Sequence, residues 1–537
     1  MPIRPQAPAA EKPNPYSPPG PGDPLVFEEF QGINTAVSRS GVPDQQMAWC
    51  DGFMPLGRRN LRTLYGLGPV LFTPTGGRTI AFFGFYNIGA TPSMLSVLSD
   101  GSVWTTNTAT SVSGLIANPG TVTGPSITTL GITQWGNLYV ILVSSASANG
   151  YWIWDGTTFY VPGGSAPGGG TMPTAIAGSA VEVYAGRVWV MNGSVISFSA
   201  PGSFKDFSTA NGGGNFSSSD SFLRVAFSNL KQTNGFLYLI ADSSINYLSG
   251  VQTSGSPPTT TFTNQNADPE VGTPWAATVD VFGRNIVFAN AFGAHISYGA
   301  AVTKISEPLD GVYNTVPNFS GVVTPSAAKA IIFGHKIWIL LLPIIDPYTG
   351  QQVNKLFMWD GKKWWSTQQE IGLTYIQHQE INSIITAWGT DTHSVWPLFQ
   401  TPSQGFTKVV QSRFWDTPGG YEYTKAAVRL WGLFYLYNLT NRNISINVDN
   451  EVGTSPQSFA LTPASLLWFN NSGQQILWTG AGGAPLTWLG ALGSVSVLPP
   501  AAAAQQGVLT GLTLVTNALD MAIVSVKVQD EIVGYRG

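Results

Sequence analysis

Charged side chains are scarce in this chain. Asp, Glu, Lys and Arg together make up 10% of its 537 residues, against about 25% in an ordinary soluble domain. The 25 basic and 29 acidic residues leave a net charge of -4 with no long basic run, which argues against tight binding to nucleic-acid phosphates. Hydrophobic residues reach 43%, so the chain is not a disordered polar polymer. Such a composition is typical either of a homo-oligomer whose subunits cover one another or of an extracellular β-protein with a Ser/Thr/Asn-rich surface.

Cysteine and histidine are also rare. Cys50 is the one cysteine, so no intrachain disulfide forms, and the four histidines lie at no zinc-binding spacing. We find neither a Walker phosphate loop nor a Gly-x-Ser-x-Gly elbow. We therefore expect no enzyme activity, no metal and no cofactor. The first residues carry no apolar signal core, and the longest apolar stretch, 337–345, is broken by Pro343 and too short to span a bilayer, so we expect no membrane segment.

A glycine followed by apolar, strand-forming residues recurs through the middle of the chain. Successive steps between these glycines are 50, 49, 48 and 51 residues. A period near 50 built from strand patterns is typical of a four-stranded propeller blade. Weaker units begin near Gly77 and Ile384, which gives about seven blades, with six and eight as alternatives. The five clear units begin at Gly136, Gly186, Gly235, Gly283 and Gly334.

The chain divides into four regions, and its predicted fold class is all-β. Residues 1–24 form a Pro-rich N-terminal arm, read either as a frayed tail or as a tie onto a neighbouring subunit. Residues 25–76 are N-terminal strands joining the platform, and residues 77–402 are the β-propeller. Residues 403–537 carry longer strand patterns off the 50-residue grid, which predict a C-terminal antiparallel β-sandwich.

Within these regions the local patterns predict individual features. Asp51-Gly52, between apolar flanks, predicts a tight turn. Ala501–Ala504, after two prolines, predicts a loop or a short turn of helix. The strand candidates of the last region are Ala426–Tyr437, Ile444–Val448, Gln475–Trp478, Leu509–Val515 and Ala522–Val528.

Two groups of residues are candidates for chemistry or contact. Arg58, Arg59 and Arg62 form the most basic spot and are candidates for contact with a partner or with DNA in a channel, the alternative being a solvated or salt-bridged loop. Propeller glycosidases gather catalytic carboxylates from different blades, although each such residue is more often a turn or cap residue. The carboxylates considered for such a pair are Asp242, Asp280, Asp310 and Glu380.

Several passages, spread over most of the chain, resemble virion proteins of tailed phages, and the best family match is the tail nozzle, or tail tubular protein B, of short-tailed phages. The resemblance is diffuse, without one diagnostic motif. It rests on Gly32–Thr35, Pro43–Gln46, Asp51-Gly52, Arg62–Gly66, Tyr184–Gly193, Ile196–Phe207, Leu509–Leu514 and Ala522–Val526.

The resemblance implies a structural protein of the virion, made in the host cytoplasm. It implies a homo-hexameric ring below the portal and adaptor, with tail-fibre proteins as further partners. Double-stranded DNA passes through the central channel of such a ring during ejection. The alternatives are a tail protein that binds a host receptor or depolymerises a glycan and, more remotely, a propeller hydrolase.

Overall fold

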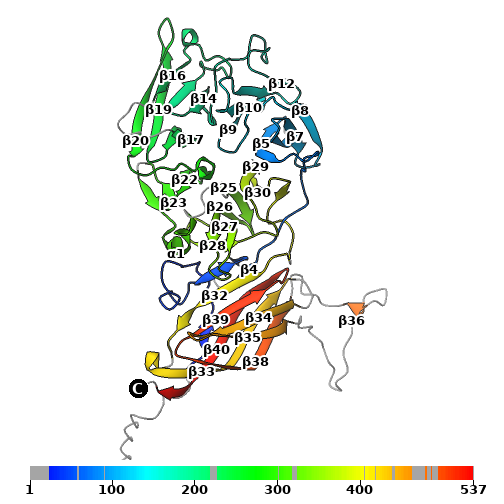
Figure 1. Cartoon of the computed structure of the whole chain (residues 1–537), viewed down its shortest axis with the longest axis vertical. Coiled ribbons are helices and arrows are strands. Elements are labelled where there is room, and N and C mark those ends of the chain that lie inside the picture. The colour runs from blue at the N-terminus through cyan, green and yellow to red at the C-terminus, as the bar shows by residue number, and fades with distance from the viewer. Residues whose placement is uncertain are drawn as a thin grey trace, which may run out of the picture.

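The computed structural model shows an elongated molecule with a propeller at one end and a β-sandwich at the other (Figure 1). Three of the predicted features lie partly outside the described residues. They are the arm (residues 1–22), the basic spot (Arg58 and Arg59) and the strand candidate Gln475–Trp478 (residues 475–477). The structure describes residues 23–56, 60–89, 91–217, 227–299, 301–316, 323–403, 405–417, 419–437, 442–461, 478–479, 485–486 and 494–535.

The chain is an all-β protein, and its upper part is a β-propeller with seven blades in the described ranges. Each blade is a small antiparallel sheet whose strands follow one another in chain order. Blade 1 comprises β5 (Ile80–Ile88), β6 (Thr91–Leu98), β7 (Val103–Asn107) and β8 (Ser113–Ala117). Blade 2 comprises β9 (Leu130–Trp135), β10 (Tyr139–Ser144), β11 (Tyr151–Trp154) and β12 (Phe159–Tyr160). Blade 3 comprises β13 (Ala180–Tyr184), β14 (Arg187–Asn192), β15 (Val195–Phe198) and β16 (Gly214–Ser217).

The remaining blades continue around the same axis (Figure 1). Blade 4 comprises β17 (Phe227–Thr233), β18 (Phe236–Ala241), β19 (Ile245–Ser254) and β20 (Thr259–Asp268). Blade 5 comprises β21 (Asp280–Phe282), β22 (Asn285–Asn290), β23 (Gly293–Ser297) and β24 (Val302–Lys304). Blade 6 comprises β25 (Ser326–Ile332), β26 (His335–Ile345), β27 (Gln352–Trp359) and β28 (Trp364–Thr367). Blade 7 has three named strands, β29 (Tyr375–Ile381), β30 (Ile384–Thr390) and β31 (Val395–Pro397).

The repeated glycines lie in the turns between the first two strands of blades 2 to 6. Each has a positive φ, between 56° at Gly136 and 83° at Gly334. The turns have three residues in blade 2 and two in blades 3 to 6, and glycine adopts the positive φ of such tight turns without steric cost. The strand after each turn is largely buried, as in the run from Arg187 to Met191. The period in the sequence is therefore the spacing of these inner hairpins.

The propeller is closed by a segment that precedes blade 1 in the chain. The amide of Leu71 donates to the carbonyl of Val395 at 2.8 Å, and the amide of Val395 donates to the carbonyl of Phe72 at 2.9 Å. Gly68 donates to Pro397 in the same way at 2.9 Å. This segment takes the place of a fourth strand in blade 7, so the structure extends the propeller upstream of residue 77.

The sandwich is built from strands at both ends of the chain. One sheet runs β3-β4-β40-β33-β38, with β1 also paired to β40, and the other runs β2-β32-β39-β34-β35. The buried side chains of both sheets belong to one hydrophobic core. The strands are β1 (Leu25–Phe27), β2 (Trp49–Asp51), β3 (Phe53–Leu56), β4 (Asn60–Thr63), β32 (Lys408–Trp415), β33 (Tyr423–Leu436), β34 (Arg442–Asp449), β35 (Thr454–Leu461), β38 (Ser494–Gly507), β39 (Thr510–Thr516) and β40 (Met521–Tyr535).

The described part of the chain also contains one short pair of strands and a few helical turns. The longest helix among them has four residues. Helical structure is therefore marginal in the described ranges. These elements are β36 (Trp478–Thr479), β37 (Pro485–Leu486), the 3-10 turns η1 (Thr209–Asn211), η2 (Ala276–Thr278), η3 (Glu307–Leu309) and η5 (Gly420–Glu422), and α1 (Asp310–Tyr313).

Propeller and sandwich share one continuous sheet. β28, the outer strand of blade 6, pairs in parallel with β2, and β2 pairs antiparallel with β32 of the sandwich. Blade 6 and one half of the sandwich thus form a single nine-stranded sheet. Because hydrogen bonds and a common core cross the junction, the two parts are joined as one rigid block rather than by a flexible linker.

Two local predictions are wrong. Asp51-Gly52 is not a hairpin turn, because β2 and β3 do not pair; Gly52, with φ 77°, lets the chain pass from one sheet of the sandwich to the other. Ala501–Ala504 is neither loop nor helix but part of β38, where Ala501 lies opposite Leu430. A long paired strand overrides the weak β-propensity of alanine there.

Candidate functional site at the propeller axis

Seven residues on the innermost strands of the seven blades recur with a constant step of 49 residues. We call this set the axial ring. Four of its members carry formal charges, alternating in sign from blade 3 to blade 6, and the seventh is a histidine. In order from blade 1 to blade 7 the axial ring is Gly84, Thr133, Glu182, Lys231, Asp280, Lys329 and His378.

Contacts on one side of the ring show that Asp280, Lys329 and His378 converge. Lys329 Nζ lies 3.5 Å from Asp280 Oδ1 and 3.8 Å from Glu380 Oε2. His378 Nδ1 of blade 7 lies 3.6 Å from Asp280 Oδ2 of blade 5, across the intervening blade. Asp280 and Lys329 are both more than nine-tenths buried. Charges buried to this extent are stable only when paired, which the alternation of signs provides.

The electrostatics of the ring follow from burial and neighbouring charge. Burial would raise the pKa of Asp280, but His378 when protonated, Lys329 and Lys231 together hold it below its usual value. Burial lowers the pKa of His378 to about 4, although Asp280 opposes that shift. Burial raises the pKa of Glu182, with Lys231 opposing. At neutral pH the ring therefore holds an ionised Asp280 and a neutral imidazole.

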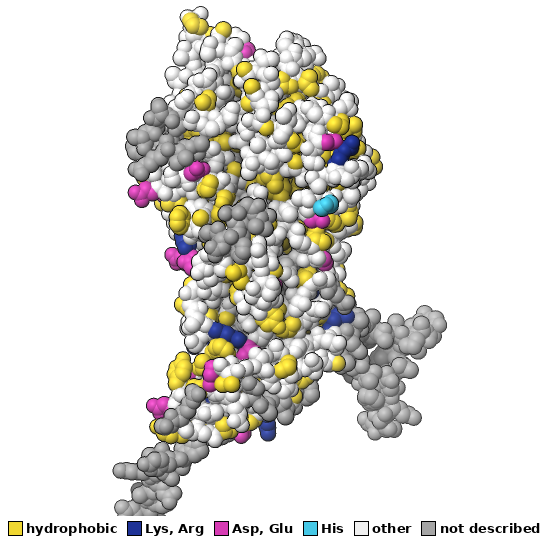
Figure 2. Space-filling model, in the orientation of Figure 1, with side chains coloured by type: hydrophobic (Ala, Val, Ile, Leu, Met, Phe, Trp, Pro, Cys, Tyr) yellow, Lys and Arg dark blue, Asp and Glu magenta, His cyan; other side chains and the backbone are white. Residues whose placement is uncertain are grey.

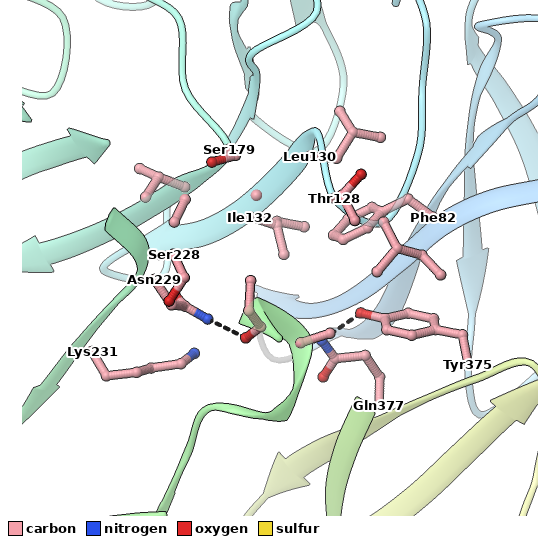
Figure 3. Close-up of a pocket in the computed structure, with 16 residues that line it drawn as sticks. Phe82, Thr128, Leu130, Ile132, Ser179, Ser228, Asn229, Lys231, Tyr375 and Gln377 are labelled. Carbon is pink, nitrogen blue, oxygen red and sulfur yellow. Dashed lines mark hydrogen bonds between the residues drawn. The ribbon is translucent and has the colours of Figure 1, made fainter. Parts of the chain in front are cut away.

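A cavity of about 90 Å³ opens on the side of the ring where the inner strands begin. Lys231 and Gln377 reach into it from two sides, while Phe82, Leu130 and Ile132 form apolar wall (Figure 3). Gln377 Nε2 donates to the hydroxyl of Tyr375 at 2.9 Å, as the dashed line shows. This volume is large enough for a few water molecules.

Two of the four carboxylates considered from the sequence, Asp280 of the axial ring and Glu380 beside it, meet at Lys329. Asp280 and Glu380 both face Lys329, so they serve as its counter-ions. Asp310 pairs instead with Lys304 at 2.7 Å, and burial raises the pKa of Asp242. In the described residues no three His, Cys, Asp or Glu side chains are grouped as a metal site would require.

Arg62 lies at the junction of propeller and sandwich and is largely buried. Its guanidinium pairs with Asp520 at 3.0 Å and donates to the hydroxyl of Tyr65 at 2.7 Å. It also lies over the rings of Tyr437, at 3.8 Å, and Phe333, at 4.4 Å. Arg62 thus has an intramolecular role that ties strand β4 to both parts. Its contact with a partner or with DNA stays a prediction, as do those of Arg58 and Arg59.

Sequence reasoning missed the axial ring as a unit. Asp280 was singled out as a carboxylate, but Glu182, Lys231 and Lys329 were not. The signal was present, because each step is 49 residues, whereas the repeat glycines vary between 48 and 51. Aligning the repeats on the inner strand instead of on the turn would have shown the alternation of charge.

Comparison with known proteins shows little similarity. No family model and no curated protein matches this chain. A solved structure of BBS1N in complex with ARL6DN is 7% identical, with 62% of this chain and 97% of that chain covered and a TM-score of 0.38. The N-terminal domain of Nup159 is 8% identical, with 65% and 98% covered and a TM-score of 0.34. No helix in the described residues is long and apolar enough to cross a membrane.

Proposed function

We propose that this chain is a structural protein of a phage tail, a subunit of a ring-forming nozzle or tail-tube component around the DNA exit path. The observation that carries the proposal is the nine-stranded sheet that continues from blade 6 into the sandwich. It joins propeller and sandwich into one stiff, elongated block, which suits a subunit of a rigid ring. The diffuse resemblance to tail nozzle proteins supports the same function.

The axis of one propeller does not serve as the DNA path in this proposal. Charged side chains of the axial ring face one another there, and the cavities on its two sides measure about 90 and 130 Å³. A duplex whose major groove alone is about 12 Å wide does not enter such spaces. The channel therefore lies between copies of the chain, along the symmetry axis of a closed ring.

The sparse surface charge suits a wall that DNA slides past. Few charged side chains appear on the face shown in Figure 2, and the net charge of the chain is -4. A wall rich in lysine would hold phosphates and make each step of DNA movement depend on salt. A near-neutral wall lets DNA pass. The portal and adaptor on one side and tail-fibre proteins on the other are the partners of this proposal.

Native mass spectrometry and negative-stain microscopy of the full chain test the proposal. We expect a closed ring of six copies of the 57.2 kDa chain, with a central opening wide enough for a duplex. A stable trimer would contradict the nozzle and favour a receptor-binding tail protein. A protein that stays monomeric at high concentration would contradict ring formation.

A further inference from the structure

A second cavity, of about 130 Å³, lies at the opposite end of the axis from the one in Figure 3. It is formed by the last residues of three inner strands: Phe85–Asn87 of β5, Gln134 of β9 and His378–Ile381 of β29. The hairpins that follow these strands surround its mouth. We call it the hairpin-side cavity. Nothing in the proposed ring assembly uses it.

Polar atoms without hydrogen-bond partners gather at this cavity. Asn87 Oδ1, His378 Nδ1 and Gln379 Nε2 are buried atoms that make no hydrogen bond within the described part of the chain, and all three residues line the cavity. Gln379 is more than nine-tenths buried. Asp280 Oδ2 lies just beyond, 3.6 Å from His378 Nδ1, so this imidazole nitrogen has a carboxylate beside it but no hydrogen bond. Since more than about 90% of buried polar groups in folded proteins are hydrogen-bonded, several such atoms at one cavity favour the binding of a polar ligand there.

The charges around the cavity favour a neutral occupant. Lys329 already lies within 4 Å of both Asp280 and Glu380, at 3.5 and 3.8 Å. Glu380 is the one carboxylate among the described residues that line the cavity, and Lys329 already pairs with it, whereas an entering anion would meet the Glu380 carboxylate. The unpartnered atoms include the carbonyl oxygen of Asn87, which accepts, and the amide nitrogen of Gln379, which donates. The occupant must therefore both donate and accept hydrogen bonds.

The walls supply an apolar surface beside the polar groups. Phe85 is half-buried, and its ring lies 5.8 Å from that of Phe83 and 5.5 Å from that of Trp388. This aromatic group holds the Phe85 ring in place at the cavity wall. A ring fixed in this way offers an apolar surface to the C–H groups of a ligand. The combination of planar amides, an imidazole and a fixed aromatic ring is typical of small-molecule sites, in which a few polar groups fix orientation.

We propose that the hairpin-side cavity binds one saccharide unit of a neutral glycan. A sugar ring carries several hydroxyl groups, each of which donates and accepts, and no charge. Its hydroxyls satisfy Asn87, His378 and Gln379, while its C–H face lies against Phe85. This function goes beyond the assembly role and does not depend on it, because the cavity lies within one protomer.

Saturation-transfer NMR on the full-length chain tests the site. The probes are glucose, galactose, mannose and N-acetylglucosamine at millimolar concentration, with glycylglycine amide and inorganic phosphate as a peptide and an ion probe. We expect transfer to at least one saccharide and none to phosphate. Asn87→Leu and Gln379→Leu should each weaken binding at least tenfold. Gln377→Leu is the matched control, because this amide on the same strand lies in the opposite cavity, and it should leave binding unchanged.

A second measurement keeps the test independent of the variants' folding. In the unaltered chain, the bound saccharide should slow amide hydrogen exchange in β29 and at the end of β5, and not in the sandwich. Absence of transfer to every saccharide overturns the proposal. So does undiminished binding in folded Asn87→Leu and Gln379→Leu chains, protection confined to other strands, or binding of only the dipeptide or phosphate.

Discussion

Replacing Lys355 with Met should destabilise the joint between propeller and sandwich. Lys355 lies in β27 and is fully buried, and its Nζ contacts Asp51 of β2 at 2.6 Å and Asp346 at 2.7 Å. The side chains of both carboxylates are only 5% exposed. Removing the lysine leaves two buried carboxylates without their cation. Loss of one partner of a buried ion pair lowers the free energy of unfolding by about 3–5 kcal/mol.

The pH dependence of this loss separates an electrostatic cause from a packing defect. Burial already raises the pKa of Asp51, with Lys355 opposing, so the pKa should rise further in Lys355→Met. As pH falls from 7 towards 4.5, that carboxyl takes up a proton and the penalty shrinks. The deficit in the free energy of unfolding, from urea denaturation followed by tryptophan fluorescence, should therefore be largest at neutral pH.

Two control variants complete the experiment. Lys362→Met changes an exposed lysine in the next turn of the same blade and should alter stability by less than about 0.5 kcal/mol. Adding Asp51→Asn and Asp346→Asn to Lys355→Met removes all three charges and should recover most of the loss. The reasoning is refuted if Lys355→Met unfolds within about 1 kcal/mol of the unaltered chain, or if its deficit is the same at pH 4.5 and pH 7.

Three further predictions concern other parts of the molecule. Burial lowers the pKa of His295 and His378 to about 4, so as pH falls below 6.5 the unfolded chain takes up these protons before the folded chain does. The free energy of unfolding should therefore decline from pH 6.5 towards pH 4, by up to about 3 kcal/mol for each histidine. A chain with both His295→Gln and His378→Gln should lose less of its free energy of unfolding over this pH range. Arg62→Met should lower the free energy of unfolding, measured by urea denaturation, by about 3 kcal/mol, since it leaves Asp520 without its cation. Arg62→Lys should keep less than half of that stabilisation, because lysine lacks the planar group that stacks on rings. Phe72→Ala should lower the free energy of unfolding by about 3–5 kcal/mol and make blade 7 sensitive to limited proteolysis. A variant that resists the protease would contradict closure of the propeller by this segment.

The propeller could be predicted from the sequence because its main signal is local and repeated. A glycine turn followed by a buried strand recurs at each of Gly136, Gly186, Gly235, Gly283 and Gly334, and hairpins between neighbouring strands leave such a pattern in one stretch of chain. The all-β fold class is confirmed by the blades themselves.

The closing segment and the sheet switch at Gly52 could not be predicted in the same way. Phe72 pairs with Val395, and Asp51 lies opposite Ser366. Pairings separated by more than 300 residues leave no local periodicity. The axial ring was missed for a different reason: a charged residue within a strand, such as Lys231, has the same local pattern as a solvent-facing one, and the alternation of charge emerges only when the repeats are aligned on the inner strand. Only the partner blades show that these charges face each other.

The order in which the strands are made has a consequence for how this protein matures in the cell. Leu25 pairs with Val528, so the first strand emerges from the ribosome roughly 25–100 s before its partner, at a translation speed of about 5–20 residues per second. Phe72 likewise cannot form its pairing until Val395 has been synthesised. Neither end of the nascent chain can finish folding until translation is nearly complete. Early strands with open edges are prone to aggregate during that interval, so production of the protein should depend on chaperones and suffer from any premature stop.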